Sequence, residues 1–63
     1  MSESILIHKG KEVPLRKYGL TDVAYFDTFE QALELGKDVQ SDWYEIRHNI
    51  FTGWKVTFKG LKL

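Results

Sequence analysis

The chain has 63 residues, nine basic and nine acidic side chains, a formal net charge of zero and no cysteine. This length allows a single domain, residues 1–63, and the missing cysteines exclude a disulfide framework and fit a cytoplasmic protein. The balanced charge excludes the broad positive field of a typical DNA-binding domain, and because no apolar run approaches the roughly 20 residues that span a bilayer, we expect no membrane partner.

Three short strands are predicted in the first part of the chain. Residues 4–9 are apolar and β-branched, and Lys9-Gly10-Lys11 indicates a turn, because glycine accepts the positive φ that tight hairpins require. A second strand follows over residues 12–17. Pro14 cannot donate a ladder hydrogen bond, so this strand belongs at a sheet edge or is broken there. Residues 23–26 form a short apolar run that fits a third strand leading into a helix.

The first strand can face the core with either of two sets of side chains. Ile5 and Ile7 form one set, and Leu6 and His8 form the other. The pattern of this strand does not separate the two alternatives, and we assign Ile5 and Ile7 to the core. An error of one residue would exchange the faces of every side chain on the strand.

A helix over residues 28–40 is the clearest local prediction. Thr28 can cap its start, and Gln31 completes a Thr-x-x-Gln capping box. Apolar residues recur at helical spacing: Phe29, Ala32, Leu33, Gly36 and Val39, with Leu35 at the margin. Glycine costs about 1 kcal/mol relative to alanine in a helix interior. Gly36 therefore indicates a close approach to the sheet, where a larger side chain would not fit.

Two antiparallel strands are predicted at the C-terminal end, over residues 42–48 and 54–59, with Asn49 to Gly53 as their loop. Side chains alternate along a strand, so one face is apolar and directed to the core: Tyr44, Ile46, Trp54, Val56 and Phe58. The other face is charged and carries a tryptophan: Trp43, Glu45, Arg47, Lys55, Thr57 and Lys59.

The predicted register of these strands has consequences for the charged face. It places Trp43 beside Lys59, which permits a cation–π contact. It also places Arg47 beside Lys55, and like charges in cross-strand positions repel mildly. An unrelieved pair of this kind on an exposed face indicates an outside anion or an acidic partner.

These elements predict an α+β fold, a mostly antiparallel sheet of four or five strands with one helix packed on one face. The contact between helix and sheet is expected to be made by apolar side chains of both. They are Phe29, Ala32, Leu33, Leu35 and Val39 on the helix, and Ile5, Ile7, Tyr44, Ile46, Trp54, Val56 and Phe58 on the sheet.

The sequence lacks the residue patterns of catalytic, metal and cofactor sites. A serine nucleophile needs a neighbouring base, but Ser2, Ser4 and Ser41 lie in a tail or a loop without glycine elbows. The two histidines, His8 and His48, belong to no paired ligand motif. We therefore expect no enzymatic activity, no metal and no cofactor.

Two surfaces are candidate interaction sites. The first is an acidic ridge, defined as Asp27, Glu30, Glu34 and Asp38. A spacing of three to four residues aligns these carboxylates along one side of the helix, where they repel one another. A solvated face is the ordinary explanation of the ridge, and a surface that matches a basic groove of a partner is the functional one.

The second candidate surface is the charged sheet face around Trp43, Arg47, Lys55 and Lys59. Small β-sheet proteins use such a face to stack a base and contact phosphates of single-stranded nucleic acid. Glu45, the acidic helix and the zero net charge argue against that ligand. A merely solvated face, with the tryptophan covering lysine stems, is the ordinary alternative.

The order of elements after Phe26 carries a resemblance to known proteins. Asp-Thr-Phe-Glu-Gln-Ala-Leu-Glu-Leu is followed by a loop, an alternating strand and Gly-Trp-Lys-Val-Thr-Phe. This half of the chain resembles small bacteriophage-encoded inhibitors of host enzymes, such as the T7-type inhibitor of RNA polymerase and small anti-CRISPR proteins. The resemblance implies an inhibitor that binds a host protein in the host cytoplasm, and it assigns no binding residue.

The sequence thus predicts a small non-enzymatic protein-binding module, with a host enzyme as its partner. It would bind through the acidic ridge or through the charged sheet face. The ridge is slightly favoured, because four carboxylates aligned at the expense of the helix need more explanation than one exposed tryptophan. A single-stranded nucleic-acid-binding domain that uses the sheet face is the alternative, and a homodimer remains open.

Overall fold

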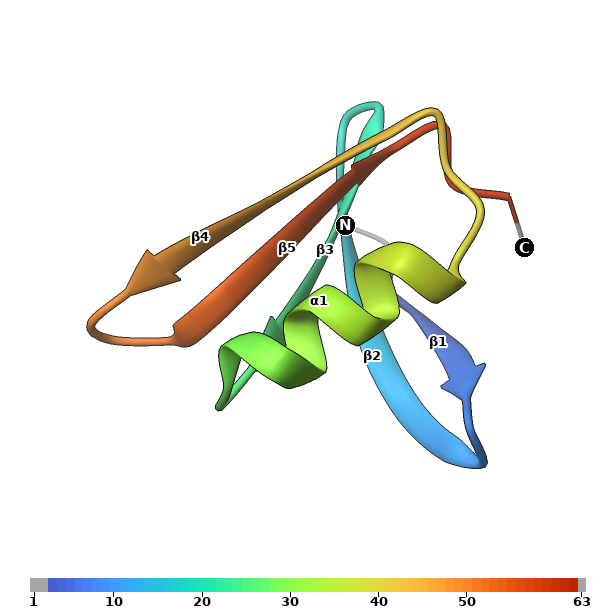
Figure 1. Ribbon diagram of the computed structural model, residues 1–63. Helices are drawn as coiled ribbons and strands as arrows, with labels where there is room; N and C mark the ends of the chain where they lie inside the picture. Colours follow the sequence, from blue (N-terminus) through green and yellow to red (C-terminus); the bar gives the residue numbers. More distant parts are fainter. Residues whose placement is uncertain (1–2, 63) are drawn as a thin grey trace.

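Five strands and one helix form in the chain, and the structure, a computed structural model, describes residues 3–62. Their bounds are β1 Glu3–His8, β2 Lys11–Tyr18, β3 Thr21–Phe26, α1 Phe29–Asp38, β4 Trp43–Asn49 and β5 Gly53–Lys59. The strand order is β1-β2-β3-β5-β4, and all neighbours are antiparallel. Because α1 packs on one face of this sheet (Figure 1), the predicted α+β fold is confirmed.

The turn between β1 and β2 sets the facing of the first strand. Lys9 and Gly10 both have positive φ, 53° and 77°, as a two-residue hairpin turn requires. The resulting register pairs Leu6 with Val13. Val13 is buried in the core, and Leu6 packs beside it.

The assignment of Ile5 and Ile7 to the core is therefore wrong by one residue. Ile5 is 60% exposed and Ile7 is 63% exposed, while the His8 side chain is only 17% exposed. The physical reason lies in β2, where the buried residues Val13 and Leu15 alternate with exposed polar ones and impose their facing on β1.

Strand β2 leaves its neighbour β3 after three residue pairs. Only Arg16 to Tyr18 pair with β3, opposite Val23 to Thr21. Pro14 lies beyond this ladder and faces Ile5 of β1 alone. The strand is thus not at a sheet edge, but its proline occupies the part without a partner on the β3 side, where a missing N–H is tolerated.

The core lies between α1 and the sheet. Its buried residues come from four elements: Val13, Leu15, Ala24, Ala32, Leu35, Val56 and Phe58. Leu35, which the sequence placed at the margin, is fully buried, and Leu33 is only half-buried. Phe29 is 44% exposed and lies edge-on to Trp54 with ring centroids 5.1 Å apart. The helix lies across the face between the two diverging outer hairpins (Figure 1). Its buried residues are Ala32, Leu35 and Gly36.

The helix ends agree with the capping pattern of the sequence. Thr28 is the N-cap, and its Oγ1 accepts a hydrogen bond from the Gln31 N–H at 3.2 Å. At the other end the Val39 N–H donates to the Leu35 carbonyl at 3.0 Å. The helix is shorter than predicted by a few residues, and at ten residues it is not long and apolar enough to cross a membrane.

Gly36 marks a close approach between the helix and the sheet, as the sequence predicted. A Cβ built on this residue would lie 2.7 Å from Cε2 and 2.8 Å from Cδ2 of Tyr44. The Tyr44 ring itself packs against Phe58, with centroids 6.4 Å apart. A methyl group at position 36 would therefore push this ring away from the core.

We expect Gly36→Ala to lower the free energy of unfolding by about 1 kcal/mol, because overpacking costs about 1–3 kcal/mol and the gain in helix propensity is only about 1 kcal/mol. In a Tyr44→Ala background the ring is absent, and the same substitution should raise the free energy of unfolding by up to about 1 kcal/mol. Urea denaturation of the four proteins measures both effects. An equal gain in both backgrounds would contradict the close packing.

Candidate functional site

The sheet face turned away from α1 is uncovered among the described residues, and we call it the open face. All four predicted residues of the charged sheet face, Trp43, Arg47, Lys55 and Lys59, lie on it. The register pairs Trp43 with Lys59 and Arg47 with Lys55, as predicted. Trp43 is 47% exposed and the Arg47 side chain is 76% exposed, so both are available for contact.

Strands β2 and β3 extend the open face with tyrosine side chains. Tyr25 lies opposite Lys55, and Tyr18 lies opposite Thr21 at the other end of β3. Tyr25 is 39% exposed and Tyr18 is 48% exposed. Between the strands a hollow of about 470 Å³ is lined by Pro14, Arg16, Tyr25 and Thr52.

The outward isoleucines of β1 complete the open face. Ile5 faces Pro14 across the β1–β2 ladder, and Ile7 faces Glu12. Sequence reasoning missed this contribution because it turned the two isoleucines inward. A usable signal was present in β2: a two-residue turn at Lys9-Gly10 pairs Leu6 with Val13, and the alternation of β2 then decides the facing of β1.

The repulsion predicted between Arg47 and Lys55 is relieved inside the chain. The Arg47 Nε–H donates to the Glu45 carboxylate two residues away on the same strand and the same face. The like-charged pair is therefore no evidence of an outside anion. The open face has alternating charges along β4 instead of a uniformly positive row.

The acidic ridge is divided by the structure. Asp27 precedes the N-cap, and Glu30 lies in the first turn of α1. Neither forms an ion pair with another described residue. Glu34 and Asp38, in the second and third turns of the helix, are paired with residues of the N-terminal hairpin. Glu34 binds the Lys9 ammonium, and Asp38 accepts a hydrogen bond from His8 Nε2 at 2.9 Å.

The pairing of the ridge follows from the path of the β1–β2 hairpin. Since His8 faces inward and Lys9 occupies the turn, both reach the helix side of the sheet. The Lys9 ammonium also lies 3.9 Å from the Asp38 carboxylate. The pKa of Asp38 is lowered, mainly by the hydrogen bond from His8 and further by the positive charge of Lys9. Its neighbour Glu34 in turn raises the pKa of Lys9.

The same cluster is the one group of described residues with the composition of a metal site. Ligand atoms of His8, Glu34 and Asp38 lie within 4.8 Å of one another. The Lys9 ammonium already supplies positive charge to both carboxylates. A metal ion would have to displace it, so the arrangement acts as an ion-paired contact between hairpin and helix.

The histidines do not form a shared site. His8 lies on β1 and His48 on β4, at opposite edges of the sheet, and the His48 ring packs on Trp54 with centroids 4.8 Å apart. A hollow of about 190 Å³ beside His8 is lined by described residues without a hydroxyl or thiol group: Lys9, Lys11, Val13, Phe26, Gln31 and Glu34. Ser2 lies outside the described residues.

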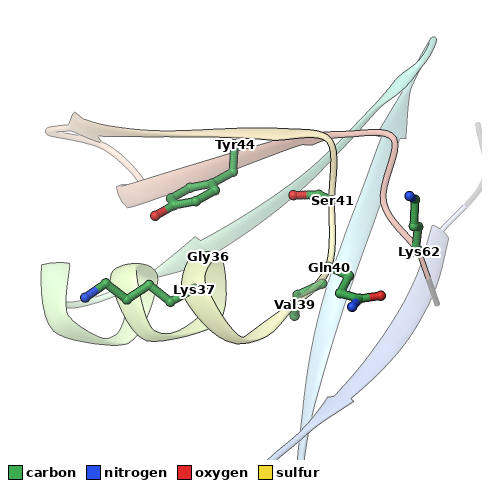
Figure 2. A pocket seen from close by; sticks show the side chains of 7 residues that line it. All are labelled: Gly36, Lys37, Val39, Gln40, Ser41, Tyr44 and Lys62. Carbon is green, nitrogen blue, oxygen red and sulfur yellow. The ribbon is translucent and has the colours of Figure 1, made fainter.

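A larger hollow, about 490 Å³, lies between the end of α1 and the start of β4. Its lining combines cationic and polar side chains: Gly36, Lys37, Val39, Gln40, Ser41, Tyr44 and Lys62. Figure 2 shows that the ammonium groups of Lys37 and Lys62 lie at opposite ends of the hollow. These charges do not converge on a common ligand position.

The turns expose three large apolar side chains that sequence reasoning did not single out. Ile50 and Phe51, at the tip of the β4–β5 hairpin, are 83% and 89% exposed, and Leu20 in the β2–β3 turn is 82% exposed. The Phe51 N–H donates to Asn49 Oδ1 at 2.8 Å, which orders the tip. Two apolar residues in a hairpin loop, where polar residues are usual, were the available signal.

The chain matches no protein-family model, no curated protein and no solved structure.

The contact between Asp38 and His8 predicts a pH dependence of stability. Because the Asp38 pKa is lowered in the folded state, its stabilisation is fully present above the ordinary aspartate pKa of about 3.9. It is lost as the pH falls through the lower folded value. At pH 7 we expect Asp38→Asn to melt at a lower temperature than the wild type, and the difference should close below about pH 4.

Glu12→Gln is the matched control, since Glu12 is an exposed carboxylate without an ion pair to another described residue. Its melting temperature should follow that of the wild type across the same pH range. Thermal unfolding followed by circular dichroism makes the comparison. A constant difference between Asp38→Asn and the wild type from pH 7 to pH 2 would show that the carboxylate charge is not what stabilises the contact.

Proposed function

We propose that the protein is a small non-enzymatic protein-binding domain that docks its partner on the open face. The observation that carries the proposal is the gathering of five large exposed side chains on one sheet face: Ile5, Ile7, Tyr18, Tyr25 and Trp43. Charged and polar residues lie between these side chains, as Thr21 and Lys59 do between Tyr18 and Trp43. Exposed aromatic and aliphatic side chains interspersed with arginine and lysine on one face are compatible with a protein interaction site. The cysteine-free composition supports a cytoplasmic setting.

The charges of the open face define the chemistry of the partner. On β4 and β5 it carries Arg47, Lys55 and Lys59 against the carboxylate of Glu45. The surplus of positive charge fits a partner with an acidic surface around an apolar centre, because complementary charge steers association and sets orientation. Tryptophan, tyrosine and arginine are also the residues that most often dominate binding energy.

The internal ion pairs of the ridge support the open face over the ridge. A basic groove that bound the ridge would compete with Lys9 for Glu34 and with His8 for Asp38. Only Asp27 and Glu30 would be gained without breaking a contact to a described residue. The ridge therefore offers an outside partner two carboxylates that are unpaired among the described residues, and not the four that the sequence indicated.

The outward isoleucines support protein over nucleic acid as the ligand. Ile5 and Ile7 neither stack on bases as aromatic rings do nor contact phosphates. Glu45 adds negative charge between Trp43 and Arg47 on β4. Single-stranded nucleic acid is the alternative ligand, because the basic residues and Trp43 of the open face could contact phosphates and stack on a base.

A host enzyme is our proposed partner, and inhibition is the proposed effect of binding. The basis is the resemblance of the helix and the C-terminal strands to small bacteriophage-encoded inhibitors. A domain without turnover of its own acts on an enzyme by occupying its surface. We expect the protein to have no hydrolase or transferase activity that is lost on His8→Ala or on His48→Ala.

The choice of surface is tested by capture from a bacterial lysate on immobilised protein, with the bound proteins identified by mass spectrometry. We expect Trp43→Ala to weaken capture of the partner by at least about tenfold, as loss of a tryptophan that anchors an interface does. The matched control is the ridge variant Asp27→Lys/Glu30→Lys, which leaves Glu34 and Asp38 paired and should capture normally. The opposite pattern would move the site to the ridge.

The choice of ligand is tested with labelled single-stranded DNA and RNA oligonucleotides. We expect no change in fluorescence anisotropy at physiological salt. If an oligonucleotide binds, with an affinity that falls steeply with salt and by about 1–3 kcal/mol on Trp43→Ala, the protein is a nucleic-acid-binding domain instead.

A further inference from the structure

Strand β4 presents an unpaired edge along its full length. It is the outermost strand of the sheet and pairs only with β5. Along such an edge, N–H and C=O groups point outward and are available to another strand. Natural edges are usually protected by proline, by charged side chains, lysine above all, or by a covering element. β4, with the sequence WYEIRHN, has no proline or lysine, its two charged residues are of opposite sign, and no described element lies beyond it in the sheet.

The order of side chains along β4 is complementary to itself. In an antiparallel pair of two β4 strands with the two-fold axis at Ile46, each strand would place Glu45 opposite Arg47 of the second copy. Ile46 would face itself on the other side of the sheet. Tyr44 would face His48, and Trp43 would face Asn49.

Charge selects this register over its neighbours. An axis at Glu45 would place two carboxylates opposite each other, and an axis at Arg47 would place two guanidinium groups opposite each other. Like charges directly across a ladder are destabilising. Glu45 and Arg47 already bind each other within one chain, which shows that both side chains lie on the open face within reach of one another. The second copy would turn this pair into an alternating row of four charges.

We propose that the protein forms a symmetric homodimer by antiparallel pairing of β4 with β4 of a second copy, joining the two sheets into one. The pairing would satisfy the open backbone edge and bring a partner strand beside Tyr44 and Ile46, which are incompletely buried in the single chain. A chain of this size buries only about 60% of the surface of its unfolded state, a smaller share than larger domains bury, so association adds stability that its own core does not supply. The dimer also places the two open faces side by side.

The proposal is tested by charge reversal and sedimentation velocity ultracentrifugation over a range of protein concentrations. Glu45→Arg and Arg47→Glu should each raise the dimer dissociation constant by about tenfold or more, because two attractive pairs become two repulsive pairs. Both side chains are on the surface, so the fold should persist. Circular dichroism verifies that it does.

Mixing the two variants is the decisive measurement. Glu45→Arg carries two positive charges on the edge and Arg47→Glu carries two negative ones, so every facing pair in the mixed dimer is attractive. We expect the equimolar mixture to form dimers at concentrations where each variant alone is monomeric. Lys11→Glu on β2, which β3 and β5 separate from β4, changes the charge by the same amount as Arg47→Glu and should leave the wild-type dimer intact.

Several outcomes would overturn the proposal. A wild-type protein that stays monomeric at every concentration excludes the dimer, and a mixture that stays monomeric excludes the Glu45–Arg47 register. The second free edge of the sheet is β1. A dimer that survives Arg47→Glu but dissociates with Ile7→Lys would place the contact there and equally refute pairing through β4.

Discussion

The short ladder between β2 and β3 is the constraint on which the rest of the structure depends. Only three residue pairs, from Arg16 to Tyr18 on β2, join the N-terminal hairpin to the remainder of the sheet. Beyond them the hairpin bends toward the helix side, so that Leu15 and Val13 enter the core and Leu6 packs beside them. The apolar contacts made by the bent hairpin offset the loss of further hydrogen bonds between β2 and β3. The bend also leaves Pro14 at a position where no backbone N–H has to pair with β3.

The path of the hairpin also determines which carboxylates of the ridge stay unpaired within the described part of the chain. It carries Lys9 and His8 to the carboxylates of Glu34 and Asp38, so half of the acidic ridge serves the fold. The turn at Lys9-Gly10 and the alternation of β2 place the isoleucines of β1 outward, beside Pro14. The path and the register of the N-terminal hairpin thus weaken the ridge as a candidate binding site and add apolar side chains to the open face.

The two proposals for this protein meet at β4. Arg47 belongs to the open face through its side chain, while the backbone of the same strand forms the free edge of the sheet. Glu45 neutralises Arg47 within the single chain and would bind the arginine of a second copy in a dimer. Self-association would use the backbone of β4 and the charges of Glu45 and Arg47, while partner binding would use the aromatic and basic side chains of the open face. Arg47 takes part in both.

What the sequence determined by itself is local. The faces and register of β4 and β5, including Trp43 beside Lys59, follow from a period of two and a loop closed by Gly53. The helix cap follows from the Thr-x-x-Gln pattern, and the tight approach at Gly36 follows from a glycine inside an apolar stripe with a period near 3.6. The facing of β1 is also determined by the sequence, but by the alternation of its neighbour β2, so it follows only when the two strands are considered together.

Only the tertiary structure decided which carboxylates remain free for a partner. His8 and Asp38 are thirty residues apart in the chain, and nothing in the pattern around either one indicates the other. Their contact depends on where β2 parts from β3 and on how far the hairpin bends over the helix. That path is set by the packing of the whole core, because a bend that left Leu15 in water would lose its burial. A periodic pattern assigns side chains to faces, but the distance between two faces is a property of the packed molecule.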